Sequence, residues 1–264
     1  KHFKLKINFM YWDQLTSPQI AELDKNIPVI LPIAAIEQHG AHLPLATDRM
    51  IGEHYCRQLN KKIGDKVLIL PTISVGCSEH HTDFAGSLSV QHTTMLNQMT
   101  DIANCVVKYG FKNLMVLNSH GGNQAIAGTF LETFGYRNPQ CRVVVATWWK
   151  IALAKLKKLN KSGQGGAGHA GELETSLMLL IAPKLVQKDK IDKKTNVPTF
   201  DWAEGDMFAG GKASLYRTMK AMTQFGVYGD ANYGTKKKGK QITKIVVKAL
   251  RGIVLDLYSI KSKQ

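Results

Sequence analysis

Four apolar runs along the chain have the length and composition of buried strands. They lie at residues 28–35, 66–71, 113–118 and 142–149. Short runs that are apolar at nearly every position are typical of strands covered on both faces, as in parallel sheets. The pattern therefore predicts a central sheet that is buried on both sides.

Segments with helical spacing of apolar residues separate these runs. The predicted helices lie at residues 13–25, 48–59, 91–109, 124–134, 150–159, 169–180 and 240–258. Asp48 is expected to cap the second of them, whereas residues 183–234 follow neither period and are expected to be irregular. Strands alternating with helices predict an α/β fold with a mostly parallel sheet. Because no repeat or linker interrupts this order, we expect residues 1–264 to form a single domain.

Polar residues follow each predicted strand. They are Glu37, His39, His42 and Asp48 after the first, His81 after the second, His120 after the third, and Trp149 at the end of the fourth. In a parallel sheet the carboxyl ends of the strands share one edge, where such folds bind their ligands. Carboxylates and imidazoles are ligands that Zn²⁺, Mn²⁺ and Fe²⁺ accept. The pattern predicts an enzyme with a metal site at this edge.

The formal charge of +15 raises the question of nucleic-acid binding. The lysines concentrate in residues 150–161, 184–194 and 236–248, which read as helix surfaces and loops. No interleaved aromatic residues or recognition motif accompanies them. A solvated basic face is therefore the preferred interpretation, with attraction of an anionic substrate as a milder effect, and we expect no specific nucleic-acid partner.

The cysteines and the apolar runs bear on the compartment. Four cysteines stand far apart and form no C-x-x-C pair, which suits a reducing compartment, so we expect a cytoplasmic protein. No apolar run approaches the ~18 residues needed to span a bilayer. The sequence begins at Lys1 rather than Met, so a removed leader stays open as an alternative.

Three motifs together resemble the creatininase (creatinine amidohydrolase) family. They are E-Q-H-G-A-H-L-P-L-A-T-D at 37–48, N-S-H-G-G-N at 118–123 and H-A-G-E-L-E-T-S at 169–176, and G-V-Y-G-D at 226–230 resembles a fourth. The resemblance implies a three-layer α/β/α sandwich and a dinuclear metal site that hydrolyses a non-peptide C–N bond, in a cyclic amide or a formamide. It also implies a small-molecule substrate and a homo-oligomer, commonly a hexamer.

The resemblance also implies the metal ligands, with two divalent ions, Zn²⁺ before Mn²⁺ or Fe²⁺. The ligands would be Glu37, His39, His120, Glu174 and, bridging both ions, Asp48. Creatininase itself has a carboxylate where this chain has Gly122, so the fifth ligand is assigned to Glu174, with Glu172 as the alternative. Those two lie about 200° apart around a helix, so only one can face the metals.

Further roles implied by the resemblance concern the substrate. His169 would transfer a proton, with Glu174 and Trp149 beside it in catalysis. Substrate contacts would come from Trp149, His81, Gly121, Gly122 and Asn123, while His42 would support a ligand. Gly122, and Gly168 in place of an acid before His169, depart from creatininase and weaken creatinine as the substrate. A keto-inositol hydrolase, a precursor-peptide peptidase and a basic nucleic-acid-binding module on the same fold stay as alternatives.

Overall fold

A computed structural model gives the fold of the chain. It describes residues 10–163, 166–192, 196–203, 207–208 and 212–260, and the statements that follow concern those residues. No helix among them is long and apolar enough to cross a membrane. The sequence is rich in glycine at residues 162–168, just before His169, and residues 164–165 of this Gly-rich segment lie outside the described ranges.

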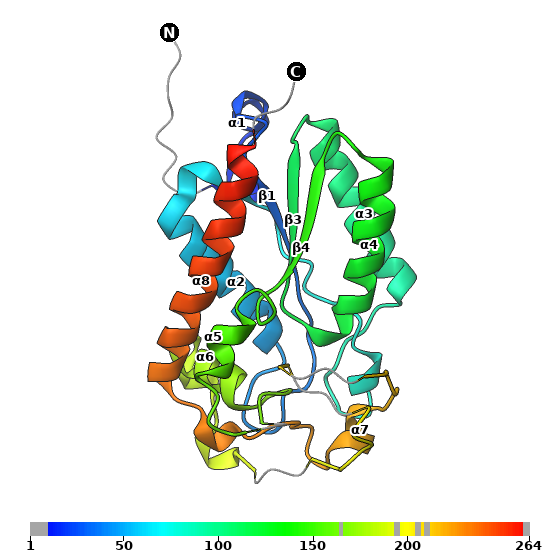
Figure 1. Cartoon of the computed structure of the whole chain (residues 1–264), viewed down its shortest axis with the longest axis vertical. Helices are drawn as coiled ribbons and strands as arrows, with labels where there is room; N and C mark the ends of the chain where they lie inside the picture. The colour runs from blue at the N-terminus through cyan, green and yellow to red at the C-terminus, as the bar shows by residue number, and fades with distance from the viewer. Residues whose placement is uncertain (1–9, 164–165, 193–195, 204–206, 209–211, 261–264) are drawn as a thin grey trace.

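A four-stranded parallel sheet lies at the centre of the described chain (Figure 1). The strands are β1 (Val29–Ile33), β2 (Leu68–Ile69), β3 (Asn113–Asn118) and β4 (Arg142–Thr147), in the order β2-β1-β3-β4. The register pairs Ile33 with Asn118 and Asn118 with Thr147. Three strands therefore end at one level, and the chain leaves them along one edge of the sheet.

Helices cover both faces of the sheet (Figure 1). They are α1 (Ser17–Glu22), α2 (Thr47–Ile63), α3 (His92–Lys108), α4 (Gln124–Arg137), α5 (Leu153–Lys157), α6 (Glu172–Ile181), α7 (Met219–Met222) and α8 (Lys236–Ser259). Ile30 and Met115 pack in a core with residues of α2, α6 and α8. Leu31 and Val116 point to the other face and pack with α3 and α4, because side chains alternate along a strand. The predicted three-layer sandwich is confirmed.

Two predicted boundaries near the first strands are wrong. The second strand is short because Pro71, which has no N–H, cannot continue the ladder. Asp48 does not cap α2: the helix begins at Thr47, and its N-cap is Ala46. Asp48 therefore lies within the first turn, with its side chain free to face the loop after β1.

Two later helices also begin elsewhere than predicted. The helix predicted from His169 begins at Glu172, because Ala170 has a left-handed φ of 54° that interrupts helical geometry. The last helix begins earlier, at Lys236, where the Thr235 hydroxyl accepts a hydrogen bond from the Lys238 N–H and caps it. His169 is thus held on a bend before α6 rather than on the helix.

Candidate metal centre

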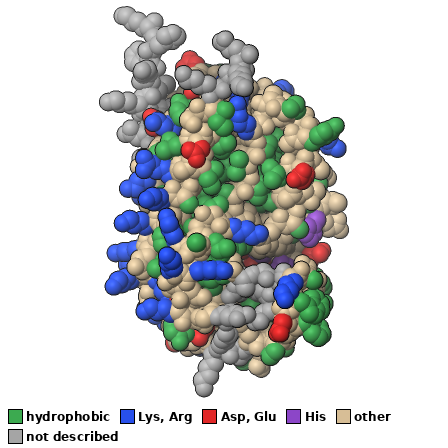
Figure 2. All heavy atoms as spheres, viewed as in Figure 1, with side chains coloured by type: hydrophobic (Ala, Val, Ile, Leu, Met, Phe, Trp, Pro, Cys, Tyr) green, Lys and Arg blue, Asp and Glu red, His purple; other side chains and the backbone are tan. Residues whose placement is uncertain are grey.

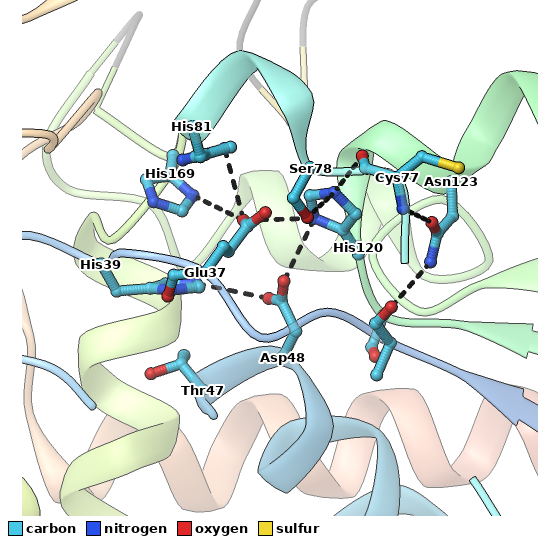
Figure 3. A network of polar contacts seen from close by, with 12 residues as sticks. Glu37, His39, Thr47, Asp48, Cys77, Ser78, His81, His120, Asn123 and His169 are labelled. Carbon is cyan, nitrogen blue, oxygen red and sulfur yellow. Dashed lines mark hydrogen bonds and ion pairs between the residues drawn. The ribbon is translucent and has the colours of Figure 1, made fainter. Parts of the chain in front are cut away.

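Carboxylates and imidazoles from four elements meet at the carboxyl edge of the sheet (Figure 3). Glu37 and His39 come from the loop after β1, Asp48 from the first turn of α2, His120 from the turn after β3, and Glu174 from α6. All five are at most 3% exposed. The structure therefore brings together every residue that the sequence proposed as a metal ligand.

Asp48 lies between two imidazoles. Its Oδ1 is 3.3 Å from His39 Nε2, and its Oδ2 is 3.1 Å from His120 Nδ1. Glu174 Oε2 lies 3.8 Å from the same His39 nitrogen, and Glu37 Oε1 lies 3.2 Å from the same His120 nitrogen. One carboxylate with a different imidazole at each oxygen is the arrangement that a bridge between two ions requires.

Glu37 faces two further imidazoles. Its Oε1 lies 3.4 Å from His81 Nε2 and 3.6 Å from His169 Nδ1 (Figure 3). Glu37, His81 and His169 form one group whose ligand atoms lie within 4.8 Å of one another, and Glu37, His39 and Asp48 form another. The cluster is thus wider than the five residues expected to bind metal.

Backbone carbonyls orient the imidazoles. Carbonyl oxygens lie within hydrogen-bonding distance of His39 Nδ1 (Glu37, 3.0 Å), His120 Nε2 (Cys77, 3.0 Å) and His169 Nε2 (Gln38, 2.7 Å). Because a carbonyl only accepts, each of these nitrogens carries the proton in the neutral ring. The lone pair of the other nitrogen then points at the carboxylates, which is the pattern seen at metal-bound histidines.

The charges perturb one another strongly. Burial lowers the pKa of His39, but the Asp48 and Glu174 carboxylates outweigh it and raise that pKa to about 9. Burial likewise opposes charge on His120, yet Glu37 and Asp48 raise its pKa well above the ordinary value. Burial, with Asp48 and Glu37 nearby, raises the pKa of Glu174 to about 7. The cluster therefore attracts positive charge.

Buried polar atoms without a hydrogen-bond partner indicate whether the cluster fits a metal ion. Both carboxylate oxygens of Glu37, Oδ2 of Asp48 and Nε2 of His39 are buried and make no hydrogen bond within the described chain. Such atoms cost free energy unless something satisfies them. Oxygen and imidazole nitrogen donors aimed at one small volume suit borderline divalent ions. The residues present fit a metal centre.

The two glutamates of α6 face different surroundings. Glu174 lies beside His39, and its Oε2 accepts a hydrogen bond of 2.6 Å from the Ala170 N–H. Glu172 points away and pairs with Lys238, while accepting hydrogen bonds from the Lys161 and Ser162 N–H groups. Its carboxylate is thus occupied outside the cluster.

A cavity of about 580 Å³ opens onto the cluster. Trp149, His81, His169 and Gly121 are among its lining residues, as the sequence suggested, together with His80 and Gln124. The apolar wall of the cavity consists of Leu153, Met207, Phe208, Met219, Met222 and Tyr228. The cavity is therefore lined by the carboxylates and imidazoles of the cluster and by an apolar wall.

Gly122 and Asn123 lie behind the cavity rather than in its lining. A Cβ on Gly122 would collide with the Cys77 carbonyl, so only glycine allows the close approach of the two loops. The Asn123 amide accepts from the Cys77 N–H and donates to the Ala34 carbonyl, both at 3.0 Å. These residues hold the His120 loop against its neighbours.

His42, on the loop between β1 and α2, contacts α6. Its Nε2 lies 3.0 Å from the Thr175 hydroxyl. Burial, reinforced by the charge of His39, lowers the pKa of His42 to about 4. His42 is therefore neutral near pH 7 and positions the loop between β1 and α2 without adding charge.

Comparison with known proteins places this site in a family. The family model described as creatininase, creatinine amidohydrolase, matches residues 13–254. The chain belongs to the creatininase family. This membership confirms the resemblance and the predicted class, that of metal-dependent amidohydrolases. The match does not test whether residues 1–264 form one domain, which stays a prediction.

Curated relatives of this creatininase-family chain carry several names. A mycofactocin precursor peptide peptidase of Mycobacterium ulcerans is 27% identical over 81% of this chain and 79% of its own length. A creatinine amidohydrolase of Pseudomonas putida is 26% identical over 86% and 88%. A 3-dehydro-scyllo-inosose hydrolase of Thermotoga maritima is 21% identical over 94% and 83%. The relatives thus differ in the molecules their names specify.

Solved creatininase structures share the fold. A crystal structure of creatinine amidohydrolase superposes with a TM-score of 0.81 at 21% identity, covering 96% of this chain and 99% of that one. A structure titled Creatininase Mn gives a TM-score of 0.80 at the same identity, with 96% and 100% covered. At this identity, the likeness establishes the fold.

Several residues of the site were not predicted from the sequence. Gln38 Nε2 lies 2.8 Å from His81 Nδ1, 3.2 Å from His169 Nε2 and 3.0 Å from the Gly226 carbonyl. The Gln38 amide thus links His81 to the chain after α7, while the Gln38 carbonyl accepts from His169. The place of Gln38 between Glu37 and His39 was the available signal. His80 had a similar signal beside His81, whereas the apolar wall comes from the segment without regular periodicity.

Proposed function

We propose that this creatininase-family chain is a metal-dependent hydrolase of a non-peptide C–N bond in a cyclic amide or formamide. The observation that supports this most is the group of buried Glu37, Asp48 and His39 atoms that make no hydrogen bond within the described chain, because a divalent cation placed among them would satisfy these donor atoms. Glu37, His39, Asp48, His120 and Glu174 would hold two divalent ions, Zn²⁺ first and Mn²⁺ or Fe²⁺ as alternatives. Bound there, the ions would polarise a carbonyl and lower the pKa of water.

His169 is proposed to move the proton. Burial and the nearby His39 charge hold the pKa of His169 well below its ordinary value, so the ring is neutral near pH 7. With its Nε2–H held by the Gln38 carbonyl, Nδ1 is the atom that accepts a proton from the nucleophile and returns it to the leaving nitrogen. His169 is 13% exposed and lines the cavity, so a substrate reaches it.

Other residues of the cavity are proposed to orient the substrate. Trp149 supplies a flat apolar face, and Gly121 leaves open space beside the cluster because no atom lies near its Cβ position. Gln38 keeps His81 and His169 in fixed orientations, through its side-chain amide and its backbone carbonyl respectively. Groups that are already oriented lower the activation free energy, because the entropy cost of positioning them does not arise during the reaction.

The test pairs metal analysis with a substrate panel. Protein purified without chelator is assayed for Zn, Mn and Fe and for hydrolysis of creatinine, other cyclic amides and formamides. Asp48→Ala should lose both ions and all activity, and His169→Ala should keep the metal while kcat falls by ~10²–10⁴. Glu79→Gln, a change at an exposed carboxylate near the cavity, is the matched control and should change neither. Full metal content and activity in Asp48→Ala would refute the proposal.

A second candidate, cleavage of a peptide bond in a precursor peptide, is supported by the apolar wall. A cavity of about 580 Å³ lies within the range that holds drug-sized ligands, and its three methionines adapt to varied side chains. Two of the relatives bear names of a peptide peptidase and a creatinine amidohydrolase. Short peptides in the same panel separate the two candidates: the preferred one requires higher kcat/KM for cyclic amides or formamides.

The expected homo-oligomer and cytoplasmic location remain proposals that the residues of the site do not address. Size-exclusion chromatography with light scattering measures the oligomeric state directly. A mass of six chains, each 29.3 kDa, would agree with the hexamer that the family resemblance implies.

A further inference from the structure

Basic side chains gather along one side of the molecule, over α2 and α8 (Figure 2). A groove of about 920 Å³ runs between these helices. Six cationic residues line it: Arg57, Lys62, Lys240, Lys244, Lys248 and Arg251. No Asp or Glu is among the described residues that line it. We name this surface the basic groove.

The charges of the basic groove are regularly placed. Lys240, Lys244 and Lys248 lie four residues apart, so they project from one face of α8 at intervals of about 6 Å. From Lys240 to Arg251, the row extends about 16 Å along the helix axis. Arg57 and Lys62, which belong to α2, stand on the opposite wall. A ligand in the groove would therefore meet cations on both sides.

None of the six cations has an ion pair within the part of the chain that the structure describes. Like charges one helical turn apart destabilise a helix. By contrast, the buried Lys238 at the start of the same helix is paired with Glu172. An anionic partner bound along this row of cations would therefore stabilise α8.

The basic groove also has an apolar part. Leu180 and Ile181, at the end of α6, and Val247 of α8 line it beside the uncharged polar side chains of Gln58 and Thr243 and beside His54. No Phe, Tyr or Trp lines the groove among the described residues, so the stacking platforms typical of single-stranded nucleic-acid sites are missing there. Cationic walls beside an apolar part match an amphipathic acidic segment, which carries both features on one helix.

A second copy of this chain does not fit the basic groove. The chain carries a formal charge of +15, and two such grooves facing each other would place their cations together. The partner must instead bring negative charge along a length of about 16 Å, or roughly three helical turns.

We propose that the basic groove between α2 and α8 docks an acidic amphipathic helical segment of another protein. This surface lies over α2 and α8, away from the cavity at the carboxyl edge, so the inference does not depend on the proposed hydrolase activity. The acidic side chains would neutralise both walls, and the apolar side chains would cover Leu180, Ile181 and Val247. Electrostatic attraction of this kind chiefly speeds association and selects the partner.

The test uses a labelled peptide of about 12 residues with Leu at i, i+4 spacing and Glu elsewhere, the pattern of a helix-in-groove ligand. Fluorescence anisotropy with the full chain at physiological salt should show saturable binding. The double reversal Lys244→Glu/Lys248→Glu should weaken binding by at least about tenfold, because attraction becomes repulsion. Arg57→Glu/Lys62→Glu, on the other wall, should do the same. Lys184→Glu/Lys188→Glu, the same change at exposed lysines outside the groove, should have little effect.

Comparison ligands distinguish this partner from others. An all-Glu peptide, oligo-dT of equal charge and phosphatidylserine vesicles are measured with the same variants. Weaker binding of all three supports the proposal. Equal binding of any of them would make the groove a general polyanion or membrane surface and would overturn it, as would absence of peptide binding or equal loss in the Lys184/Lys188 control. Circular dichroism of each variant is the control for correct folding.

Discussion

The buried pair between Lys238 and Glu172 holds the segment that carries His169, and breaking it should be costly. Glu172 is fully buried and Lys238 is 6% exposed. The Glu172 carboxylate also accepts hydrogen bonds of 2.8 Å from the Ser162 N–H and 3.0 Å from the Lys161 N–H. One carboxylate thus joins α6, α8 and the start of the Gly-rich segment that leads to His169.

The substitution Lys238→Met removes the cation while keeping most of the side-chain volume. Removing one partner of a buried ion pair typically costs about 3–5 kcal/mol, because the remaining charge stays buried. For a chain of this size, each kcal/mol lowers Tm by roughly 2–4 °C, so a fall of about 10 °C is expected. In Lys238→Met/Glu172→Gln, the glutamine keeps an acceptor for both N–H groups without charge, so part of the loss should return.

Thermal and urea unfolding of the variants measure these differences, with Lys240→Met as the control. Lys240 is an exposed lysine on the same helix without an ion pair in the described chain, so its replacement should change stability by less than about 0.5 kcal/mol. A cost below about 1 kcal/mol for Lys238→Met, or a double variant less stable than the single one, would show that the buried pair does not stabilise the fold in this way.

Three further predictions concern the loops and the groove. Gly122→Ala should cost about 1–3 kcal/mol in unfolding free energy, because its Cβ would overlap the Cys77 carbonyl. Asn123→Ala should cost a similar 1–3 kcal/mol by leaving the Cys77 N–H and the Ala34 carbonyl unpaired; urea titration measures both, and costs under 0.5 kcal/mol would contradict them. Burial, with nearby cations, lowers the pKa of His54 from 6.5 to about 4. The unfolded chain therefore binds more protons between these values, and stability should fall by up to about 3 kcal/mol as pH drops from 6.5 to 4. His54→Gln should reduce that fall, and an unchanged pH dependence would contradict the assignment.

The sheet and the gathering of site residues followed from local pattern. Apolar runs predicted β1, β3 and β4 nearly in place, because strands buried on both faces leave little other choice of residue. Convergence of Glu37, Asp48 and His120 followed from the geometry of parallel strands, which end at one edge. The strands and the convergence of these site residues could be predicted because they depend on neighbouring residues in the sequence and on the common direction of the strands.

Features set by distant contacts could not be predicted. The bend at Ala170, where φ is 54°, depends on the Glu174 carboxylate that accepts from its N–H. Most of the apolar lining of the cavity comes from Met207, Phe208, Met219, Met222 and Tyr228, which lie in a part of the sequence without helical or strand periodicity. The pairing of Glu172 with Lys238 joins residues 66 positions apart along the chain, so local pattern could not indicate it.

The placement of the basic residues in the fold could not be predicted from composition. Composition indicated only that the chain is basic, and a solvated face was the preferred interpretation. The structure instead gathers six of those cations around one groove that also has an apolar part, because α2 and α8 pack side by side with their basic stripes adjacent. Pairing of two helices distant in sequence created this surface, and helical spacing on each helix alone did not reveal it.

The metal centre is best tested by the metal content of the wild-type chain and of Glu174→Gln, both purified without chelator. We expect about two divalent ions per wild-type chain and fewer in the variant, because Glu174 lies 3.8 Å from the same His39 nitrogen that faces Asp48. One ion in the wild type would require a mononuclear mechanism. No bound metal, and none taken up on titration, would contradict the proposal of a metal-dependent hydrolase.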